Sequence, residues 1–523
     1  MLVSVPRRRG RKLGAALLPL LLLTAAGCAT GPSQRPPVAY EGSQQQVAPA
    51  PQPPGPAPLP PLGPPNRDTL TWHDCTGPTS ARLGAPTAPV SCSTMASTMD
   101  PPEAPGAGIV RISLLSAGSG AVPLLVLNDA GGEPGTVAAA RLAQRMPPEL
   151  LRTFRIIGMD RRGTGTSDPA DCLPPPQRRT MAGFDPQATD PGQLAQLHAA
   201  VRETSQQCLL ALDERAQAYD TSRAALDVAE LRERLGVPRM HALARGEASR
   251  VLTTFAQRHP DQVGRMVLDG SPDPRADAQQ AAEARAGSAE GAFDAFAAAC
   301  GRSGRCPLGP DPRGAVAQLV ERARTAPVPA PAGPVPAGLV VRAVLRGIGD
   351  PARWPELTGA LARARSGDGS GLAELARPLV EPGPAGPPRM TGGMITRCND
   401  TTLRIPPQQV PALAADWTRR FPLFGGVFAQ DLVHCGQWPV PQRTPPVPDE
   451  PALPPILVLS TAHDPTVPAA GSATTSRQLS AGVLLRWLGS GHGAAGRSDC
   501  ATAAVTRFLV RGAVPTPNTV CPA

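Results

Sequence analysis

The sequence predicts an α/β protein with a mostly parallel sheet, helices on both faces of that sheet, and an inserted helical lid. Short apolar runs alternate with amphipathic helical patterns in two separate stretches of the chain, which is typical of a parallel α/β sheet. Two of these runs, at residues 123–127 and 154–159, are too apolar for a one-sided antiparallel sheet and fit strands that are buried on both faces. An Ala-rich region broken by Pro and Gly lies between the two stretches. One sheet assembled from two halves of the chain explains all three observations.

The first half of the core is expected at residues 67–274. Its predicted strands are apolar and short, and they lie at residues 109–115, 123–127, 154–159, 240–244 and 265–268. Two helices are predicted between them. Residues 222–235 carry Leu and Val at helical spacing and end before a glycine, and residues 248–258 follow the fourth strand.

The lid is predicted at residues 275–395, where Ala-rich helical stretches are broken by Pro-Gly loops. Within it, residues 339–341 are the one candidate strand. The α/β rhythm returns in the second half of the core, residues 396–523. The expected order there is a strand at 455–459, a helix at 470–479, a strand at 483–487 and a helix at 500–510.

Composition limits the classes of function. The chain has 523 residues, 41% of them hydrophobic and 18% charged, which is ordinary for a globular protein with a full core. The formal net charge is +9, but more than half of it comes from the cluster of Arg and Lys in the first twelve residues. The rest of the chain therefore gives no indication of nucleic-acid binding. Lys12 is the single lysine of the sequence, so a chain without its leader has no Schiff-base lysine.

The N-terminus has the form of an export signal. Residues 1–27 contain a basic segment, an apolar run at 13–23 that is too short to cross a bilayer comfortably, and small residues before Cys28. The ending Ala-Ala-Gly-Cys resembles a bacterial lipobox, which implies a lipid-modified Cys28 and attachment to a membrane. An ordinary signal peptide followed by an incidental cysteine is the alternative. We therefore expect an exported protein, either a cell-envelope lipoprotein or a secreted one, with a Pro/Gln-rich tether at residues 28–66.

The cysteines indicate disulfides. Apart from Cys28 there are ten, an even number in a chain expected to be exported. Sequence neighbours suggest the pairs Cys75–Cys92, Cys172–Cys208, Cys300–Cys306, Cys398–Cys435 and Cys500–Cys521. The sequence contains no C-x-x-C motif and no cluster of Cys and His at metal spacing. We therefore expect neither a metal nor a cofactor.

Reactive groups of an open α/β sheet lie on loops at the carboxyl ends of the strands. One such loop, residues 158–167 (GMDRRGTGTS), is similar to the G-x-D-x-R-G-x-G-x-S segment of secreted actinobacterial α/β hydrolases of the tripeptidyl aminopeptidase type. Further segments that resemble this family, in its order, are VGRMVLDG at 263–270, CND at 398–400, CGQWP at 435–439, HDPTVP at 463–468, GHG at 491–493 and SDC at 498–500. The resemblance covers residues 72–521. It implies the α/β-hydrolase fold and hydrolysis of peptides from their N-terminus, or of related small acyl substrates.

The chemistry of this family is acyl transfer by a Ser-His-Asp triad whose serine lies on a G-x-S-x-G elbow. The resemblance assigns the acid to Asp464 and the base to His492. A plainer interpretation makes Asp464 a turn residue before a proline and His492 a loop residue between glycines. The elbow itself aligns with residues 244–249 (ARGEAS), which puts Gly246 in the place of the serine. Glycine has no side chain and cannot attack a carbonyl carbon.

The loop that would stabilise an oxyanion also departs from the family. A pattern near N-P-G-G-P-G becomes NDAGGEPG at residues 128–135, with Gly131, Gly132 and Glu247 as the candidate oxyanion-loop residues. Asp129 and Glu133 add carboxylates to this loop, and their charges oppose an oxyanion if they point inward.

Three hypotheses follow. The leading one is a degenerate hydrolase that binds a peptide or an envelope ligand without turnover, since losing a triad serine costs roughly 10⁶-fold in kcat. The alternative is an active peptidase or esterase in which Ser249 or Glu247 replaces the serine and works with His492 and Asp464. A purely structural role in the envelope is the third, and it predicts that no ligand binds.

Overall fold

The computed structural model describes residues 57–523 except 84–87, 100–107, 385, 442–443 and 447–451. The expected signal peptide, Cys28 and most of the tether at residues 28–66 lie outside the described residues. No helix of the described part of the chain is both long enough and apolar enough to cross a membrane.

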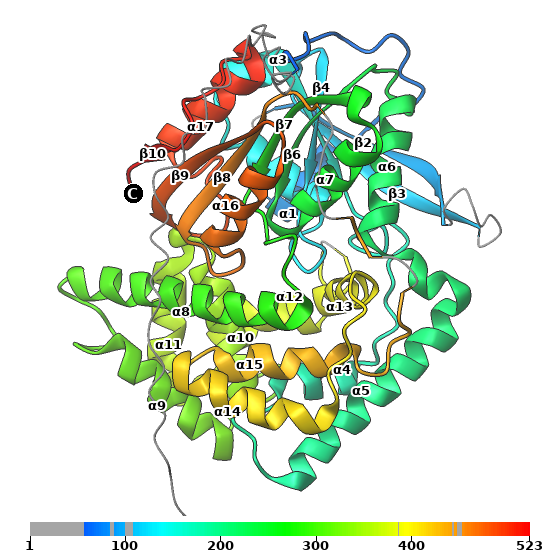
Figure 1. The fold of residues 1–523 in the computed structure, drawn as a ribbon. Helices are drawn as coiled ribbons and strands as arrows, with labels where there is room; N and C mark the ends of the chain where they lie inside the picture. The colour runs from blue at the N-terminus through cyan, green and yellow to red at the C-terminus, as the bar shows by residue number, and fades with distance from the viewer. Residues whose placement is uncertain (1–56, 84–87, 100–107, 385, 442–443, 447–451) are drawn as a thin grey trace, which may run out of the picture. The chain divides into compact units, whose positions relative to one another are not determined.

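The described residues form one sheet of ten strands, in the order β1-β2-β3-β5-β4-β6-β7-β8-β9-β10 (Figure 1). Pairing is antiparallel from β1 to β5 and parallel from β5 through β4 to β10. The strands are β1 (His73–Asp74), β2 (Val90–Thr98), β3 (Ile109–Ala117), β4 (Val122–Leu127), β5 (Phe154–Met159), β6 (Met240–Arg245), β7 (Val263–Asp269), β8 (Ile456–His463), β9 (Gly482–Ser490) and β10 (Thr519–Cys521). The mostly parallel sheet that the sequence predicts is confirmed, with the two exchanged strands β4 and β5 at its centre.

The central strands are buried because they are apolar on both faces. All six residues of β4 are buried, and so are all seven of β7. Leu124 and Val126 of β4 pack in one apolar cluster with helices α2, α3 and α17. Leu125 and Leu127 point the other way, into the cluster that contains α6 and α7. Helices therefore cover both faces of the sheet, as expected.

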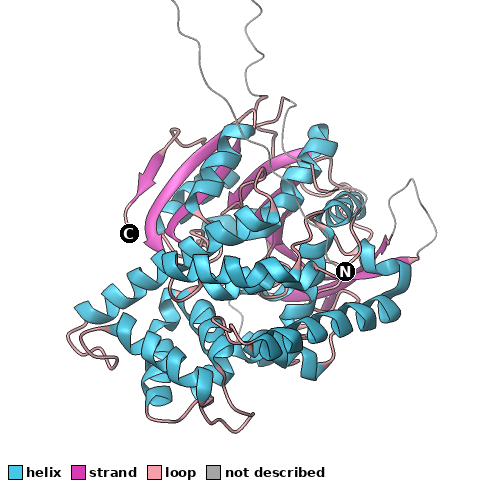
Figure 2. Ribbon diagram, turned by 60° about the horizontal axis from the view of Figure 1, so that its bottom comes forward, coloured by secondary structure: helices cyan, strands magenta, loops and turns pink. Residues whose placement is uncertain are grey.

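The helices that flank the sheet are α1 (Thr76–Leu83), α2 (Gly135–Ala143), α3 (Pro148–Thr153), α6 (Thr221–Arg234), α7 (Ser249–Arg258), α16 (Ala469–Gln478) and α17 (Asp499–Thr506), whereas α4 (Pro175–Gly183) and α5 (Pro191–Leu212) lie beside the helices between β7 and β8 (Figure 1). Between β7 and β8 the chain forms a cap of α8 (Ala278–Arg302), α9 (Pro312–Thr325), α10 (Ala337–Ile348), α11 (Trp354–Arg365), α12 (Ser370–Val380), α13 (Arg389–Asn399), α14 (Val410–Arg420) and α15 (Gly425–Gln430). The cap consists of helices and loops (Figure 2).

The cap differs from the predicted lid in two ways. Its helices do not end at residue 395 but continue through α14 and α15 to the short 3-10 helix η6 (Asp431–Cys435). The predicted strand at 339–341 is wrong, because these residues lie in α10. There Val340, Val341, Val344 and Ile348 are buried at helical spacing, so packing overrides the β-branched character of the segment.

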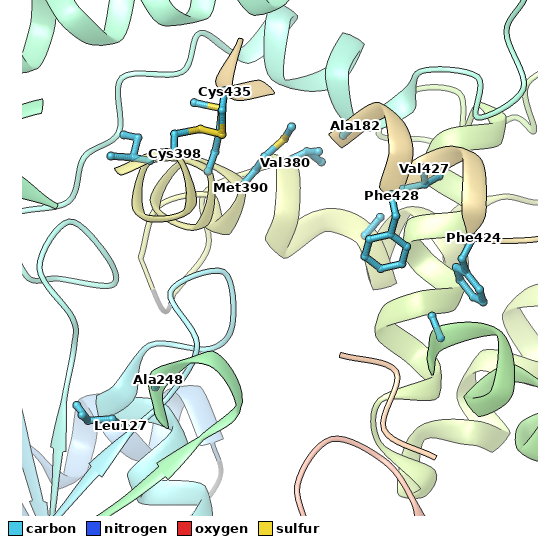
Figure 3. Close-up of a cluster of buried hydrophobic side chains, with 14 of the residues drawn as sticks. Leu127, Ala182, Ala248, Val380, Met390, Cys398, Phe424, Val427, Phe428 and Cys435 are labelled. Carbon is cyan, nitrogen blue, oxygen red and sulfur yellow. A yellow bond between two sulfur atoms is a disulfide. The ribbon is translucent and has the colours of Figure 1, made fainter. Parts of the chain in front are cut away.

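All five predicted disulfides are present: Cys75–Cys92, Cys172–Cys208, Cys300–Cys306, Cys398–Cys435 and Cys500–Cys521. The Cys398–Cys435 bridge joins α13 to η6 within the cap (Figure 3). Ala182 of α4 belongs to the same apolar cluster as Phe428 of α15 and Phe424 just before that helix, so α4 packs with the cap as well (Figure 3).

Candidate active site

The elbow predicted after the fourth core strand is present. Strand β6 ends at Arg245, and α7 begins at Ser249 only a few residues later. Between them Gly246 has a φ of +64°, in the left-handed region that favours glycine. The tight strand-to-helix turn is therefore kept, although alanines replace both of its flanking glycines.

The carboxylate of Asp129 occupies the space that a side chain at position 246 would need. A Cβ atom built on Gly246 would lie 2.3 Å from Oδ1 of Asp129 and 2.7 Å from Oδ2. Oδ1 accepts a hydrogen bond of 2.5 Å from the backbone N–H of Glu247. Oδ2 lies 2.8 Å from Nε2 of His492. The ring N–H is not aimed along this contact, so it is an ion pair rather than an aligned hydrogen bond.

His492 lies between two carboxylates. It follows β9, and its Nδ1 is 3.1 Å from each oxygen of Asp464, which follows β8. Burial alone would lower the pKa of His492, but the charges of Asp464 and Asp129 outweigh it and raise the pKa to about 10. Burial would raise the pKa of Asp129, but the charge and contact of His492 lower it instead. At neutral pH the pair is thus an imidazolium and a carboxylate.

Backbone donors fix Asp464 and the loop that carries His492. Asp464 accepts N–H groups of Thr466 at 2.8 Å, Val467 at 3.0 Å and Gly493 at 3.1 Å. These bonds hold the carboxylate against the imidazole ring.

Asp269, at the end of β7, provides a second brace. Its buried carboxylate accepts the N–H groups of Ala494 at 2.6 Å and Ala495 at 3.2 Å and pairs with Arg245 at 3.3 Å. The residues after His492 are therefore bound to the strand next to the elbow.

The cap is also bonded to these loops. The backbone N–H of His492 donates to the carbonyl of Gly349, just after α10, at 2.8 Å. The hydroxyl of Ser288 in α8 donates to the carbonyl of Asp464 at 2.7 Å. Both the acid loop and the histidine loop thus depend on the cap for their position.

Both of the backbone donors that a hydrolase uses to bind an oxyanion already bind carboxylates here. Those donors are the N–H of the residue after the nucleophile and an N–H of the loop that in this chain follows β4. The first, on Glu247, binds Asp129. The second, on Ala130, donates to Oε2 of Glu247 at 3.2 Å. Of the predicted loop glycines, Gly132 gives its N–H to the carbonyl of Asp129, and Gly131 lies against Gly393 of α13.

The two residues considered as replacement nucleophiles are held by other groups. Ser249 is buried, donates to the carbonyl of Gly246 at 2.7 Å, and lies 2.9 Å from the hydroxyl of Ser271. Glu247 receives two bonds from Arg161, at 2.7 and 2.9 Å. None of these partners is His492, so neither residue takes the place of the serine in this structure.

The functional residue that the sequence interpretation missed is Asp129. Its place on the oxyanion loop was recognised, but it was expected to oppose an oxyanion rather than to fill the nucleophile's position.

The GMDRRGTGTS segment, in contrast, has a structural role. Asp160 binds the backbone of Thr136 and Thr166, and Arg162 forms a buried ion pair with Asp227. Among the described residues, no group of His, Cys, Asp and Glu is arranged to hold a metal ion.

The strand order, the elbow after β6, the acid after β8 and the histidine after β9 define the class of protein. The chain is an α/β hydrolase by fold. Comparison with known proteins agrees with this class, since the family model described as "TAP-like protein" matches residues 421–521.

Three curated relatives are hydrolases by name. The chain is 28% identical to serine protease Hip1 of Mycobacterium tuberculosis, over 76% of this chain and 80% of that protein. It is 28% identical to carboxylesterase B of the same species, over 75% and 78% of the two chains. It is 24% identical to tripeptidyl aminopeptidase of Streptomyces coelicolor, over 87% and 86%.

Proposed function

We propose that this protein is an exported member of the α/β hydrolases that does not act as a serine hydrolase and binds a peptide or related acyl ligand without cleaving it. The observation that carries the proposal is the carboxylate of Asp129 in the position of the serine side chain. A serine hydrolase needs a hydroxyl at this point, and Gly246 supplies none.

The state of His492 supports the same conclusion. A general base must be able to take a proton, but His492 is paired with carboxylates at both ring nitrogens and is charged at neutral pH. The oxyanion donors are also satisfied internally, by Asp129 and Glu247. A scissile carbonyl group would have to displace both carboxylates before it could be polarised.

The class of ligand is taken from the relatives, which are named a serine protease, a carboxylesterase and a tripeptidyl aminopeptidase. A peptide with a free N-terminus is therefore the first ligand to test. Export is supported by the signal-like residues 1–27 and by the five disulfides, which persist in oxidising compartments. We further propose that Cys28 carries a lipid and that the Pro/Gln-rich tether holds the domain at a membrane.

The decisive experiment restores the serine with and without Asp129. The purified full-length protein is assayed with a chromogenic tripeptide amide and a short p-nitrophenyl ester, beside Gly246→Ser, Asp129→Ala and the double variant. We expect the native protein and both single variants to be silent. Gly246→Ser alone still carries the carboxylate that charges His492. The double variant frees the Glu247 N–H and the imidazole, so we expect turnover from it.

Binding is measured separately, by calorimetric titration of the native protein with an unlabelled tripeptide. Saturable binding without product supports the proposal, whereas no binding favours the structural role. Cleavage by the native protein that His492→Ala abolishes would contradict the loss of catalysis.

A further inference from the structure

We propose that a small cavity between the N-terminus of α13 and two loops of the core binds a small monovalent anion such as chloride. The groups that would hold the anion are the first N–H groups of α13, the hydroxyl of Thr391 and the guanidinium of Arg389. The site does not use His492 or the elbow, and the inference does not depend on the proposed binding of peptides.

The cavity lies where the cap meets the core. Its walls come from residues 130–134 after β4, residues 163–170 after β5 and residues 387–392 at the start of α13. Its volume of about 20 Å³ is enough for one or two molecules the size of water. Glycines bring the helix close to both loops, because a Cβ atom on Gly392 would lie 2.9 Å from Cγ2 of Thr164, and one on Gly393 would lie 2.8 Å from Cα of Gly131. A bound ion therefore contacts the cap and the core at once.

The first turn of α13 supplies hydrogen-bond donors. The helix begins at Arg389, directly after two prolines, and no side chain of the described residues caps its N–H groups. The first N–H groups of a helix have no acceptor within the helix, and they carry the positive end of its dipole. An anion is the kind of ligand that such groups favour.

The hydroxyl of Thr391 is an independent sign of a ligand. Thr391 lines the cavity and is only 1% exposed, and among the described residues its Oγ1 has no hydrogen-bond partner. Buried hydroxyls in proteins are nearly always hydrogen-bonded to the protein, to water or to an ion. The same residue belongs to the first turn of α13, so the hydroxyl and the N–H groups face one bound species.

The charges around the cavity favour an anion over a water molecule. Arg389 lines the cavity, and no carboxylate of the described residues forms an ion pair with it. Nearby, Arg346 of α10 donates to the carbonyl of Leu375 rather than to an acid. Glu133, the acid that both arginines share, already pairs with Arg141 at 3.3 Å. Positive charge is therefore in excess here, and an anion compensates it.

The titration of the two arginines agrees with this excess. Burial lowers the pKa of Arg389, and burial together with the charge of Arg389 lowers the pKa of Arg346 to about 9. The size and charge of the anion are limited by the same surroundings. Phosphate and sulfate are too large for the cavity, and the carboxylate of Glu133 in its wall repels a second negative charge. A halide or a small carboxylate such as formate remains.

The test uses chloride as the probe. Thermal melting of the full-length protein is followed while sodium chloride replaces sodium gluconate at constant ionic strength. We expect the Tm to rise with the logarithm of the chloride concentration, because a ligand that binds the folded state stabilises it. A parallel series with sodium formate tells a small carboxylate from a halide. In crystals grown with sodium bromide, we expect an anomalous peak in the cavity.

Two variants connect the effect to the site. Thr391→Val keeps the shape of the side chain and loses the hydroxyl, so the anion should bind about tenfold more weakly. Arg389→Gln should lose the dependence on chloride. The matched control is Arg419→Gln on α14, which removes the same charge from an exposed ion pair with Asp416 and should keep the dependence.

The readout is the change of Tm with anion concentration, so a variant that is less stable overall still gives an answer. Circular dichroism confirms that each variant is folded. An equal Tm of the native protein in chloride, formate and gluconate would mean that the cavity holds water only, and it would overturn the inference. An effect of chloride that survives in both variants, or bromide crystals without a peak in the cavity, would overturn it as well.

Discussion

The charge on His492 can be measured by removing one of its two carboxylates. In Asp129→Asn the amide oxygen can still accept the N–H of Glu247, while the amide NH₂ faces Nε2 of the ring. A donor then replaces an anion at that nitrogen, so the neutral imidazole is favoured. We expect the pKa of His492 to fall well below about 10 in this variant, towards the ordinary range of a histidine with a single carboxylate partner.

The size of the effect follows from the pKa of His492. A rise from 6.5 to about 10 corresponds to about 5 kcal/mol of stabilisation of the charged ring, at 1.36 kcal/mol per unit. Since two carboxylates share this effect, Asp129→Asn should lose about 2 kcal/mol of unfolding free energy. A pKa raised by folding gives stabilisation that is complete below pH 6.5 and disappears as the pH rises towards about 10. The difference between the native protein and the variant should therefore be larger at pH 6 than at pH 9.5.

Two measurements check this prediction. NMR titration of the His492 ring gives its pKa, and urea unfolding at pH 6 and 9.5 gives the difference in stability. Other charges near the ring are Arg497, which donates to the His492 carbonyl, and Arg245, which pairs with Asp269. Both are present in the native protein and in the variant, so their contributions largely cancel. A native His492 that titrates near pH 6.5, or an equal loss of stability at both pH values, would refute the reasoning.

Two further predictions concern stability. Gly246→Ala places a Cβ atom 2.3 Å from Asp129 Oδ1 at a left-handed φ, so we expect a loss of about 1–3 kcal/mol in urea unfolding, and an unchanged midpoint would contradict the steric reason. Replacing Cys398 and Cys435, which are 37 residues apart, should cost about 1.5 kcal/mol more than replacing Cys300 and Cys306, which are 6 apart. Thermal melting of the two double-serine variants compares them, and equal losses would contradict a dependence on loop length.

Local patterns were sufficient to predict the parallel core. Strand β4 is apolar throughout and β7 is apolar apart from Arg265 and Asp269, and β6 and β9 could be placed because a helix follows each of them. Strand β2 (VSCSTMAST) was missed because Ser and Thr fill it, and its burial on one face depends on its antiparallel pairing with β3. The end of the cap was also missed. The helices at residues 410–430 follow prolines and have short apolar stretches, which resemble loop sequence until they pack on α8.

The site was predicted only in part. Asp464 and His492 were assigned because the segments that carry them resemble motifs of the tripeptidyl aminopeptidase type in the order of that family, and the structure brings the two side chains into contact. The absence of a serine was visible directly at Gly246. The position of Asp129 was not, because the direction of its carboxylate depends on the space left by a residue more than a hundred positions away. Neither sequence segment alone contains that information.

The shared space at the elbow also limits how this sequence can change. The side chain of Asp129 and any side chain at position 246 are sterically exclusive in the present backbone, since their atoms would overlap. A serine placed at position 246 alone would therefore push the Asp129 carboxylate away from His492. A substitution at position 129 alone would leave Nε2 of His492 without its carboxylate partner. Each residue therefore makes the other harder to replace, and a serine at position 246 would need a second change at position 129 to be accommodated.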